Sequence, residues 1–135
     1  MVVLLFLACS TKPQAIKYGF DSCHFCRMTI VDKIHAAEIV TKKGKVFKFD
    51  AVECMINYNK EINDETVAKY LTNHYENPEE LIDATKASFF VSESVPSPMG
   101  EFLTAFKAKT EAERVRVEKE GEIYSWEEIL NRLNQ

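Results

Sequence analysis

Gly44 to Asp50, with the sequence Gly-Lys-Val-Phe-Lys-Phe-Asp, is the stretch that decides the fold of this chain. The glycine permits a hairpin turn, and the residues after it alternate apolar and polar side chains as a strand does. The alternating residues 36–41 supply the other strand of the hairpin. Apolar side chains at helical spacing follow, so we predict a helix with Asp50 as its N-cap and Glu53 as its capping-box partner.

A similar pattern lies near the C-terminus. Residues 121–127 read Gly-Glu-Ile-Tyr-Ser-Trp-Glu, which is again a glycine, an alternating strand, an aromatic residue and an acidic residue before a helix. Ser125 is expected to cap that helix, with Glu128 at the capping-box position. A duplicated ββ(α)βα unit accounts for both patterns. The predicted fold class is therefore α+β, with two small related halves of antiparallel strands and flanking helices.

The remaining elements are assigned to these halves, which we place at residues 17–60 and 86–135. Short strands are predicted at residues 29–31, 87–91, 102–106 and 122–124, and a charged helix is predicted at residues 109–119. The polar residues 60–78 predict a linker between the halves, with a short helical stretch near Val67 and Leu71. Residues 92–100 contain two prolines and a glycine, which predicts a rigid loop.

The first residues predict a secretory signal peptide of the lipoprotein type. Residues 1–9 are apolar and end in Leu-Ala-Cys, the small-residue-then-cysteine pattern of bacterial lipoproteins. This apolar stretch is too short to span a bilayer, which needs about 20 residues. We expect residues 1–16 to be signal and tether, with Cys9 lipidated and the domain at residues 17–135 held at a membrane of the cell envelope, facing the periplasm. The alternative is an apolar N-terminus with a fortuitous cysteine.

Composition excludes several classes of function. The 135 residues suffice for one modest core, and a net charge of -4 without a Lys/Arg-rich block argues against nucleic acid as a partner. The chain contains no Ser-His-Asp arrangement, Gly-rich phosphate loop or HExxH motif. There is therefore no positive signal for an enzyme.

Residues 23–28 read Cys-His-Phe-Cys-Arg-Met and place two thiols, an imidazole and a thioether in one short segment. Thiolate and thioether sulfur prefer soft ions such as Cu(I). With Cys9 used as an anchor, three cysteines remain, which is an odd number for a disulfide framework. Two other interpretations stay open: a redox or structural disulfide between Cys23 and Cys26, or a zinc site, for which the other Cys and His residues have no standard spacing.

Further donors are less certain from sequence. Met99 lies in a rigid Pro-Met-Gly turn, which suits the presentation of a sulfur better than core packing. Cys54 lies early in the predicted helix, where it is either a ligand or a buried residue without a role. His24 is expected to face either solvent or the metal. His35 and His74 have polar neighbours, which predicts surface positions.

Three motifs together resemble the NosL family over about residues 18–133. They are Cys23-x-x-Cys26-x-Met28, Gly44-Lys45-x-x-x-Phe49-Asp50-x-x-x-Cys54-Met55 and Pro98-Met99-Gly100. The family comprises envelope lipoproteins that are accessory to nitrous oxide reductase. The resemblance implies a Cu(I)-binding chaperone that is not an enzyme and that delivers copper to that reductase, and a fold of two small halves similar in topology to organomercurial lyase. It also implies Cys26 and Met28 as first ligands, with Met99 from the other half as a third.

The chain departs from the family pattern at Arg27, which puts a positive charge beside the motif, and at Cys54-Met55, which adds soft donors. Two rival functions stay open. One is an enzyme, either a thiol oxidoreductase or an organomercurial-lyase-like enzyme that uses Cys26, Cys54 and Asp50. The other is a structural module stapled by a Cys23–Cys26 disulfide. Only the copper interpretation uses both Met28 and Met99.

Overall fold

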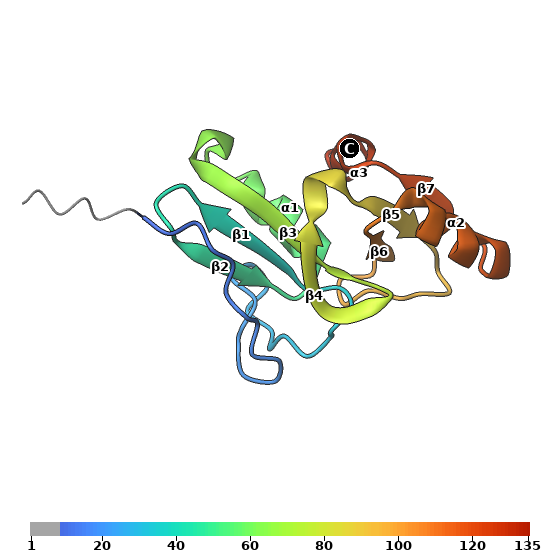
Figure 1. Ribbon diagram of the computed structural model, residues 1–135, viewed down its shortest axis with the longest axis horizontal. Helices are drawn as coiled ribbons and strands as arrows, with labels where there is room; N and C mark the ends of the chain where they lie inside the picture. The colour runs from blue at the N-terminus through green and yellow to red at the C-terminus, as the bar shows by residue number, and fades with distance from the viewer. Residues whose placement is uncertain (1–8) are drawn as a thin grey trace, which may run out of the picture.

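The computed structural model describes residues 9–135, so the predicted signal segment at residues 1–8 lies outside them. The elements are β1 (Ala37–Thr41), β2 (Val46–Phe49), α1 (Val52–Asn59), the 3-10 helix η1 (Asp64–Thr66), β3 (Val67–His74), β4 (Asn77–Asp83), the 3-10 helix η2 (Ala84–Lys86), β5 (Ser88–Val91), β6 (Leu103–Phe106), α2 (Lys109–Glu118), β7 (Glu122–Tyr124) and α3 (Trp126–Leu133). They form two antiparallel sheets, with the strand orders β2-β1-β3-β4 and β6-β5-β7, side by side in Figure 1. The predicted class of antiparallel strands with flanking helices is confirmed. Among residues 9–135, every helix is too short or too polar to cross a membrane.

The predicted hairpin is confirmed. β1 and β2 pair antiparallel, with Ala37 opposite Phe49 and Val40 opposite Val46. Gly44 takes a φ of 85° in the turn, a conformation that L side chains rarely adopt. The alternating pattern therefore fixes the register, because a slip of one residue would turn Phe49 away from the core.

The prediction that Asp50 caps the following helix is wrong. Ala51 is the N-cap of α1 and makes no side-chain capping bond, because it keeps an extended backbone that delays the first helical residue to Val52. Glu53 is not a capping-box partner either, since its carboxylate accepts a hydrogen bond from Ser97. The carboxylate of Asp50 therefore does not cap α1 and can interact with other groups.

The predicted C-terminal helix is confirmed, but the duplication is not. Ser125 caps α3 and forms a capping box with Glu128. Gly121, however, follows α2, and a side chain there would collide with Phe90 and the backbone of Val91. Gly121 is needed because the backbone passes close to β5, whereas Gly44 is needed for a hairpin turn. The two similar stretches of sequence therefore do not form the same structural unit.

Residues 60–78, predicted as a linker with a short helix, are largely strand. β3 is a central strand that pairs with β1, with Leu71 opposite Glu38, and β4 pairs with β3 on the other side. The helical stretch expected near Val67 is therefore wrong. Exposed side chains such as Ala68 and Lys69 hide the strand pattern in the sequence. The strand predicted at residues 29–31 is also wrong, because this segment makes a single bridge between Ser22 and Thr29.

Different segments pack against the two faces of the four-stranded sheet. Ile39, Phe47 and Phe49 are buried in the same hydrophobic cluster as the apolar side chains of α1. On the opposite face, residues 10–16, which we call the N-terminal strap, cross β1 and β2 (Figure 1). The N–H of Gln14 donates to the Glu38 carboxylate at 2.9 Å, and Lys48 donates to the carbonyl of Ala15 at 2.9 Å. The expected tether is thus docked on the sheet from residue 10 onward.

Candidate metal site

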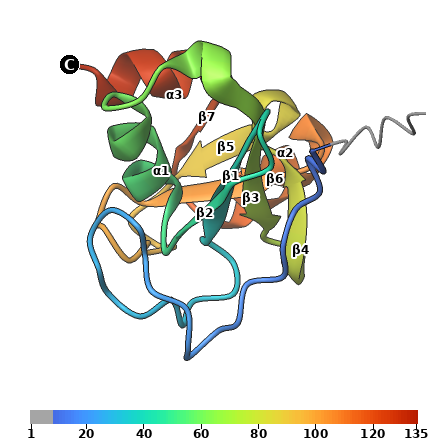
Figure 2. The same ribbon diagram turned by 90° about the vertical axis from the view of Figure 1, so that its left-hand side faces the viewer.

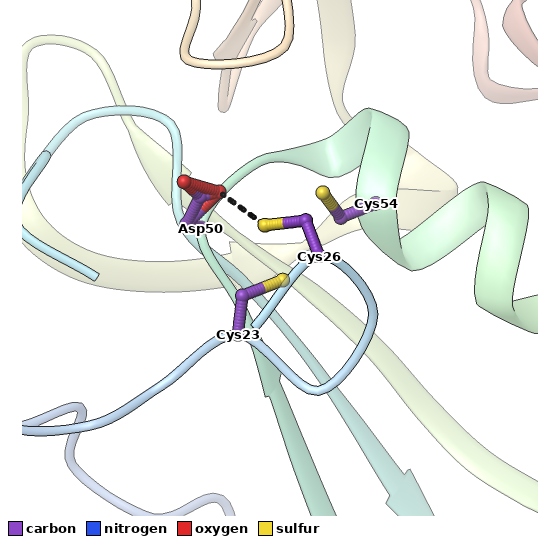
Figure 3. Close-up of side chains that lie close together, drawn as sticks. All are labelled: Cys23, Cys26, Asp50 and Cys54. Atoms are coloured by element: carbon purple, nitrogen blue, oxygen red, sulfur yellow. Dashed lines mark hydrogen bonds between the residues drawn. The ribbon is translucent and has the colours of Figure 1, made fainter. Parts of the chain in front are cut away.

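Three cysteines and one aspartate converge beside the N-terminus of α1. The sulfur atoms of Cys23, Cys26 and Cys54 and one carboxylate oxygen of Asp50 all lie within 4.8 Å of one another. We call these four residues the thiol site (Figure 3). All three cysteines are free thiols, and the Cys26 thiol donates to Asp50 at 3.9 Å. Sequence reasoning foresaw Cys23 and Cys26 and left Cys54 open. It expected Asp50 to be a helix cap, or to act with Cys26 and Cys54 in the enzyme alternative.

The backbone of a short loop holds Cys23 and Cys26 in place. The N–H of Cys23 donates to the carbonyl of Met28 at 2.8 Å, and the N–H of Arg27 donates to the carbonyl of Cys23 at 3.0 Å. Arg27 takes a φ of 68°, which turns the chain tightly at the tip of the loop. The N–H of His24 donates to the carbonyl of Lys48, so the loop is fastened to β2 immediately before Asp50.

The surroundings of Cys23 stabilise its thiolate. The Cys54 thiol and the backbone N–H groups of Asp50, Cys26 and Phe25 surround the Cys23 sulfur with positive ends of dipoles. Their stabilisation of the negative charge outweighs the cost of burying it and lowers the pKa of Cys23 to about 5. Of the three thiols, Cys23 therefore loses its proton most easily.

The other groups of the thiol site hold their protons more tightly. The neighbouring Cys23 sulfur, together with burial, raises the pKa of Cys54 far above its ordinary value. Burial raises the pKa of Cys26, and burial with the nearby Cys23 charge raises the pKa of Asp50 to about 6. A cation that binds all three sulfurs must therefore displace protons from Cys26 and Cys54.

Access to the thiol site runs through its outer members. Cys23 and Cys54 are fully buried, whereas Cys26 is half-buried. Met28, two residues beyond Cys26, is 58% exposed. Its thioether is thus available to an incoming ion or partner, although its ligation remains a prediction.

The loop that carries Met99 is tied to α1 beside Cys54. Ser97 donates to the Glu53 carboxylate at 2.6 Å and accepts from the N–H of Phe102 at 3.0 Å, and Glu53 directly precedes Cys54. Met99 lies two residues beyond Ser97 and is 37% exposed. This buried connection agrees with the sequence argument that the loop is rigid. Ligation by Met99 remains a prediction.

The histidines differ from the sequence expectations. The ring of His24 packs against Phe47 and Tyr58 at centroid distances of 4.6 Å and 4.9 Å, outside the thiol site. Burial, with the nearby Arg27 charge, lowers its pKa. The surface positions predicted for His35 and His74 are wrong, since these residues are only 2% and 4% exposed. Polar neighbours in sequence do not prevent burial: the nearby Asp32 pairs with the ring of His35, and Glu111 from α2 lies 3.2 Å from the ring of His74.

The thiol site also contains Cys26, Cys54 and Asp50, the residues on which the organomercurial-lyase-like alternative depends. Geometry alone therefore admits both a soft-metal site and thiol chemistry. The sequence connects Asp50 with these cysteines only through that alternative and through the Phe49-Asp50 step of the family motif, because an acidic residue before a helix otherwise indicates a cap.

Comparisons with known proteins bear on this choice. The NosL family model matches residues 15–133. The copper-binding lipoprotein NosL of Stutzerimonas stutzeri is 28% identical in an alignment that covers 93% of this chain and 70% of the relative. The crystal structure of the copper chaperone NosL from Shewanella denitrificans matches with a TM-score of 0.74 at 25% identity, over 88% of this chain and 96% of that one. Neither relative is named as an enzyme.

Proposed function

The chain belongs to the NosL family, and from that premise we propose that it binds Cu(I) at the thiol site and delivers it to a copper enzyme such as nitrous oxide reductase. Two of its relatives, a copper-binding lipoprotein and a copper chaperone, support copper as the cargo and the cell envelope as the location. In this proposal the lipid on Cys9 holds the domain at the membrane, facing the periplasm.

The observation that carries the proposal is the convergence of three sulfurs within 4.8 Å of one another. Cys23 is buried among them, and its lowered pKa makes it the easiest of the three to deprotonate, which favours an anionic soft donor. Sulfur-rich sites of low coordination number select Cu(I). The same four residues also have the ligand number of a structural zinc site. The exposed thioether of Met28 has no use in that alternative.

Transfer requires a site that binds tightly and still releases its ion. Buried Cys23 and Cys54 hold the ion, whereas half-buried Cys26 and exposed Met28 lie where an incoming ligand can attack. Exchange then proceeds by adding a donor from the partner before a donor of this chain leaves. Met99, on its tied loop, supplies a further thioether at the surface.

The test is anaerobic Cu(I) loading of the reduced protein, followed by competition with a Cu(I) chelator of known affinity. We expect one tightly bound Cu(I) per chain and Zn(II) bound far more weakly. Cys26→Ser and Cys23→Ser should each weaken Cu(I) binding by about 100-fold or more, which is about 2.7 kcal/mol. Cys9→Ser is the matched control, because Cys9 is exposed and lies outside the thiol site.

Two results would overturn the proposal. Zinc held as tightly as copper would indicate a structural site, and Cys26→Ser with the affinity of the parent would remove the thiol site from copper binding.

Transfer is tested by mixing the loaded protein with copper-free nitrous oxide reductase and following copper into the reductase. The Met28→Ala variant shows whether the exposed donor sets the transfer rate.

A further inference from the structure

A second group of possible ligands lies between the β3–β4 turn and α2 and shares no residue with the thiol site. His74 ends β3, Glu76 lies in the turn between β3 and β4, and Glu111 lies in the first turn of α2. One nitrogen of His74 and one carboxylate oxygen from each glutamate all lie within 4.8 Å of one another. In Figure 1 this turn extends toward the half of the molecule that carries α2.

The Nε2 atom of His74 is buried and has no hydrogen-bond partner. It lies 3.2 Å from Oε2 of Glu111 while the His74 side chain is only 6% exposed. The two atoms are thus close but misaligned for a hydrogen bond. Two ligands of one tetrahedral zinc ion, at bond lengths of about 2.1 Å, lie about 3.4 Å apart. The observed separation therefore suits two donors that face a common cation.

The opposite nitrogen of His74 is oriented as in known metal sites. Nδ1 lies 3.4 Å from Oε2 of Glu80. The Glu80 carboxylate also accepts hydrogen bonds from Asn77, to Oε2 at 3.0 Å, and from Lys107, to Oε1 at 3.2 Å. Metal-binding histidines usually donate their second N–H to a carboxylate, which fixes the tautomer and leaves the other nitrogen free to bind the metal. Glu80 supplies that partner to His74.

The two glutamates provide one fixed and one adjustable ligand. Oε2 of Glu111 accepts from the N–H of Ala108 at 2.8 Å, which holds its carboxylate at the start of α2. Glu76 is exposed and contacts Arg114, with 3.2 Å from Nη2 to each oxygen. An exposed ion pair of this kind contributes little free energy, so Glu76 is able to turn toward a cation.

We propose that His74, Glu76 and Glu111 bind a borderline divalent cation, Zn(II) in the first place, at a site independent of the thiol site. One imidazole and two carboxylates are nitrogen and oxygen donors, which suit Zn(II) and are poor ligands for Cu(I). Water fills the fourth position on the exposed side of Glu76. The bound ion ties the β3–β4 turn to α2, and its binding free energy adds to the stability of the fold.

Cobalt titration of the reduced chain under anaerobic conditions separates the two sites. Cobalt(II) substitutes for Zn(II), and only thiolate ligation gives intense sulfur-to-cobalt charge-transfer absorption. We expect some of the bound cobalt to lack that absorption. In NMR spectra, the ring nitrogen signals of His74 should shift, and the chain has only three histidines to assign. Glu111→Gln should weaken the binding of this cobalt at least about tenfold, since it removes an anionic ligand. Glutamine is itself accepted at the capping-box position, so α2 is retained.

Glu113→Gln is the matched control, because Glu113 lies in the same helix and pairs with Arg116. It should bind cobalt like the parent. Zinc should raise the melting temperature of the parent and of Glu113→Gln, and raise it less in Glu111→Gln. The proposal would be overturned if all bound cobalt had thiolate ligands. It would also be overturned if Glu111→Gln bound cobalt at this site as tightly as the parent. Neither result depends on whether the thiol site binds Cu(I).

Discussion

Met28 is the most exposed sulfur-containing residue of the loop that carries Cys23 and Cys26, with 58% of its surface open to solvent. Replacing it with alanine removes a neutral thioether and leaves all three sulfurs of the thiol site. We expect Met28→Ala to weaken Cu(I) binding about tenfold, which is less than the loss expected for a cysteine. Anaerobic chelator competition measures the change. Val31→Ala, at a nearby position that is 66% exposed, is the control and should bind like the parent. An unchanged affinity in Met28→Ala would show that this sulfur is no ligand.

Glu38 is a buried carboxyl group on β1 whose titration affects the stability of the fold. Its side chain accepts from the N–H of Gln14, while its other oxygen has no partner. Burial raises its pKa from 4.5 to about 7. The folded state therefore binds this proton more tightly than the unfolded state. The stabilisation is complete below pH 4.5 and is lost as the pH rises to about 7.

Glu38→Gln should remove this loss of stability. The shift of the Glu38 pKa from 4.5 to about 7 corresponds to about 3 kcal/mol at most. We therefore expect the variant to unfold at higher urea concentration than the parent at pH 8, with a gain of about 1–3 kcal/mol, and to show little gain at pH 4.5. Glu93→Gln, at an exposed position, should change neither value. A parent whose stability is constant between pH 4.5 and 7 would contradict the role given to Glu38.

At the residue scale, the sequence predicts the donors that are neighbours in the chain. Cys23 and Cys26 follow from their spacing. Asp50 does not, because an acidic residue before a helix fits an N-cap as well as a ligand, and a shift of one residue in the start of α1 decides between them. The burial of His74 comes from packing against segments that are distant in sequence, among them α2, whose Glu111 lies 3.2 Å from its ring, so no local pattern predicts it.

Among the elements, the hydrogen bond between Ser97 and Glu53 connects the loop of residues 92–102 to α1. Ser97→Ala leaves a buried carboxylate without its donor, which costs about 1–3 kcal/mol. If Met99 is a ligand, the variant should also bind Cu(I) more weakly, because the loop loses the connection that places its sulfur. Urea unfolding and chelator competition measure the two effects. Ser94→Ala, at an exposed position of the same loop, should show neither.

The elements with a strong local pattern were predictable, and those whose pattern depends on distant partners were not. The hairpin and α3 follow from a glycine turn and a capping box. β3 and β4 were missed because β3 lies between β1 and β4 and exposes polar side chains near its start, so its pattern resembles a linker. Its strand character comes from pairing with β1, which lies 26 or more positions earlier in the chain.

For the whole molecule, the proposed anchor and the proposed copper site should be separable. Cys9 is exposed and lies outside the thiol site. In cells, with a complete secretory signal, Cys9→Ser should move the protein from the membrane fraction to the soluble fraction or leave it unprocessed. The Cu(I) affinity of the purified domain should not change. Fractionation with detection of the attached lipid measures the first effect. A parent found in the soluble fraction would contradict lipid anchoring.

The docked strap sets how far the domain can stand from a bilayer. A side chain at Gly44 would come within 2.5 Å of the carbonyl oxygen of Ser10, so the backbone already lies against the hairpin at that residue. Cys9 is its immediate neighbour, which leaves about 3.5 Å of unattached chain. A lipid on Cys9 would therefore fix both the height and the tilt of the domain above the headgroups. Under the proposed function, an acceptor of the ion would then have to approach the membrane surface to reach the thiol site.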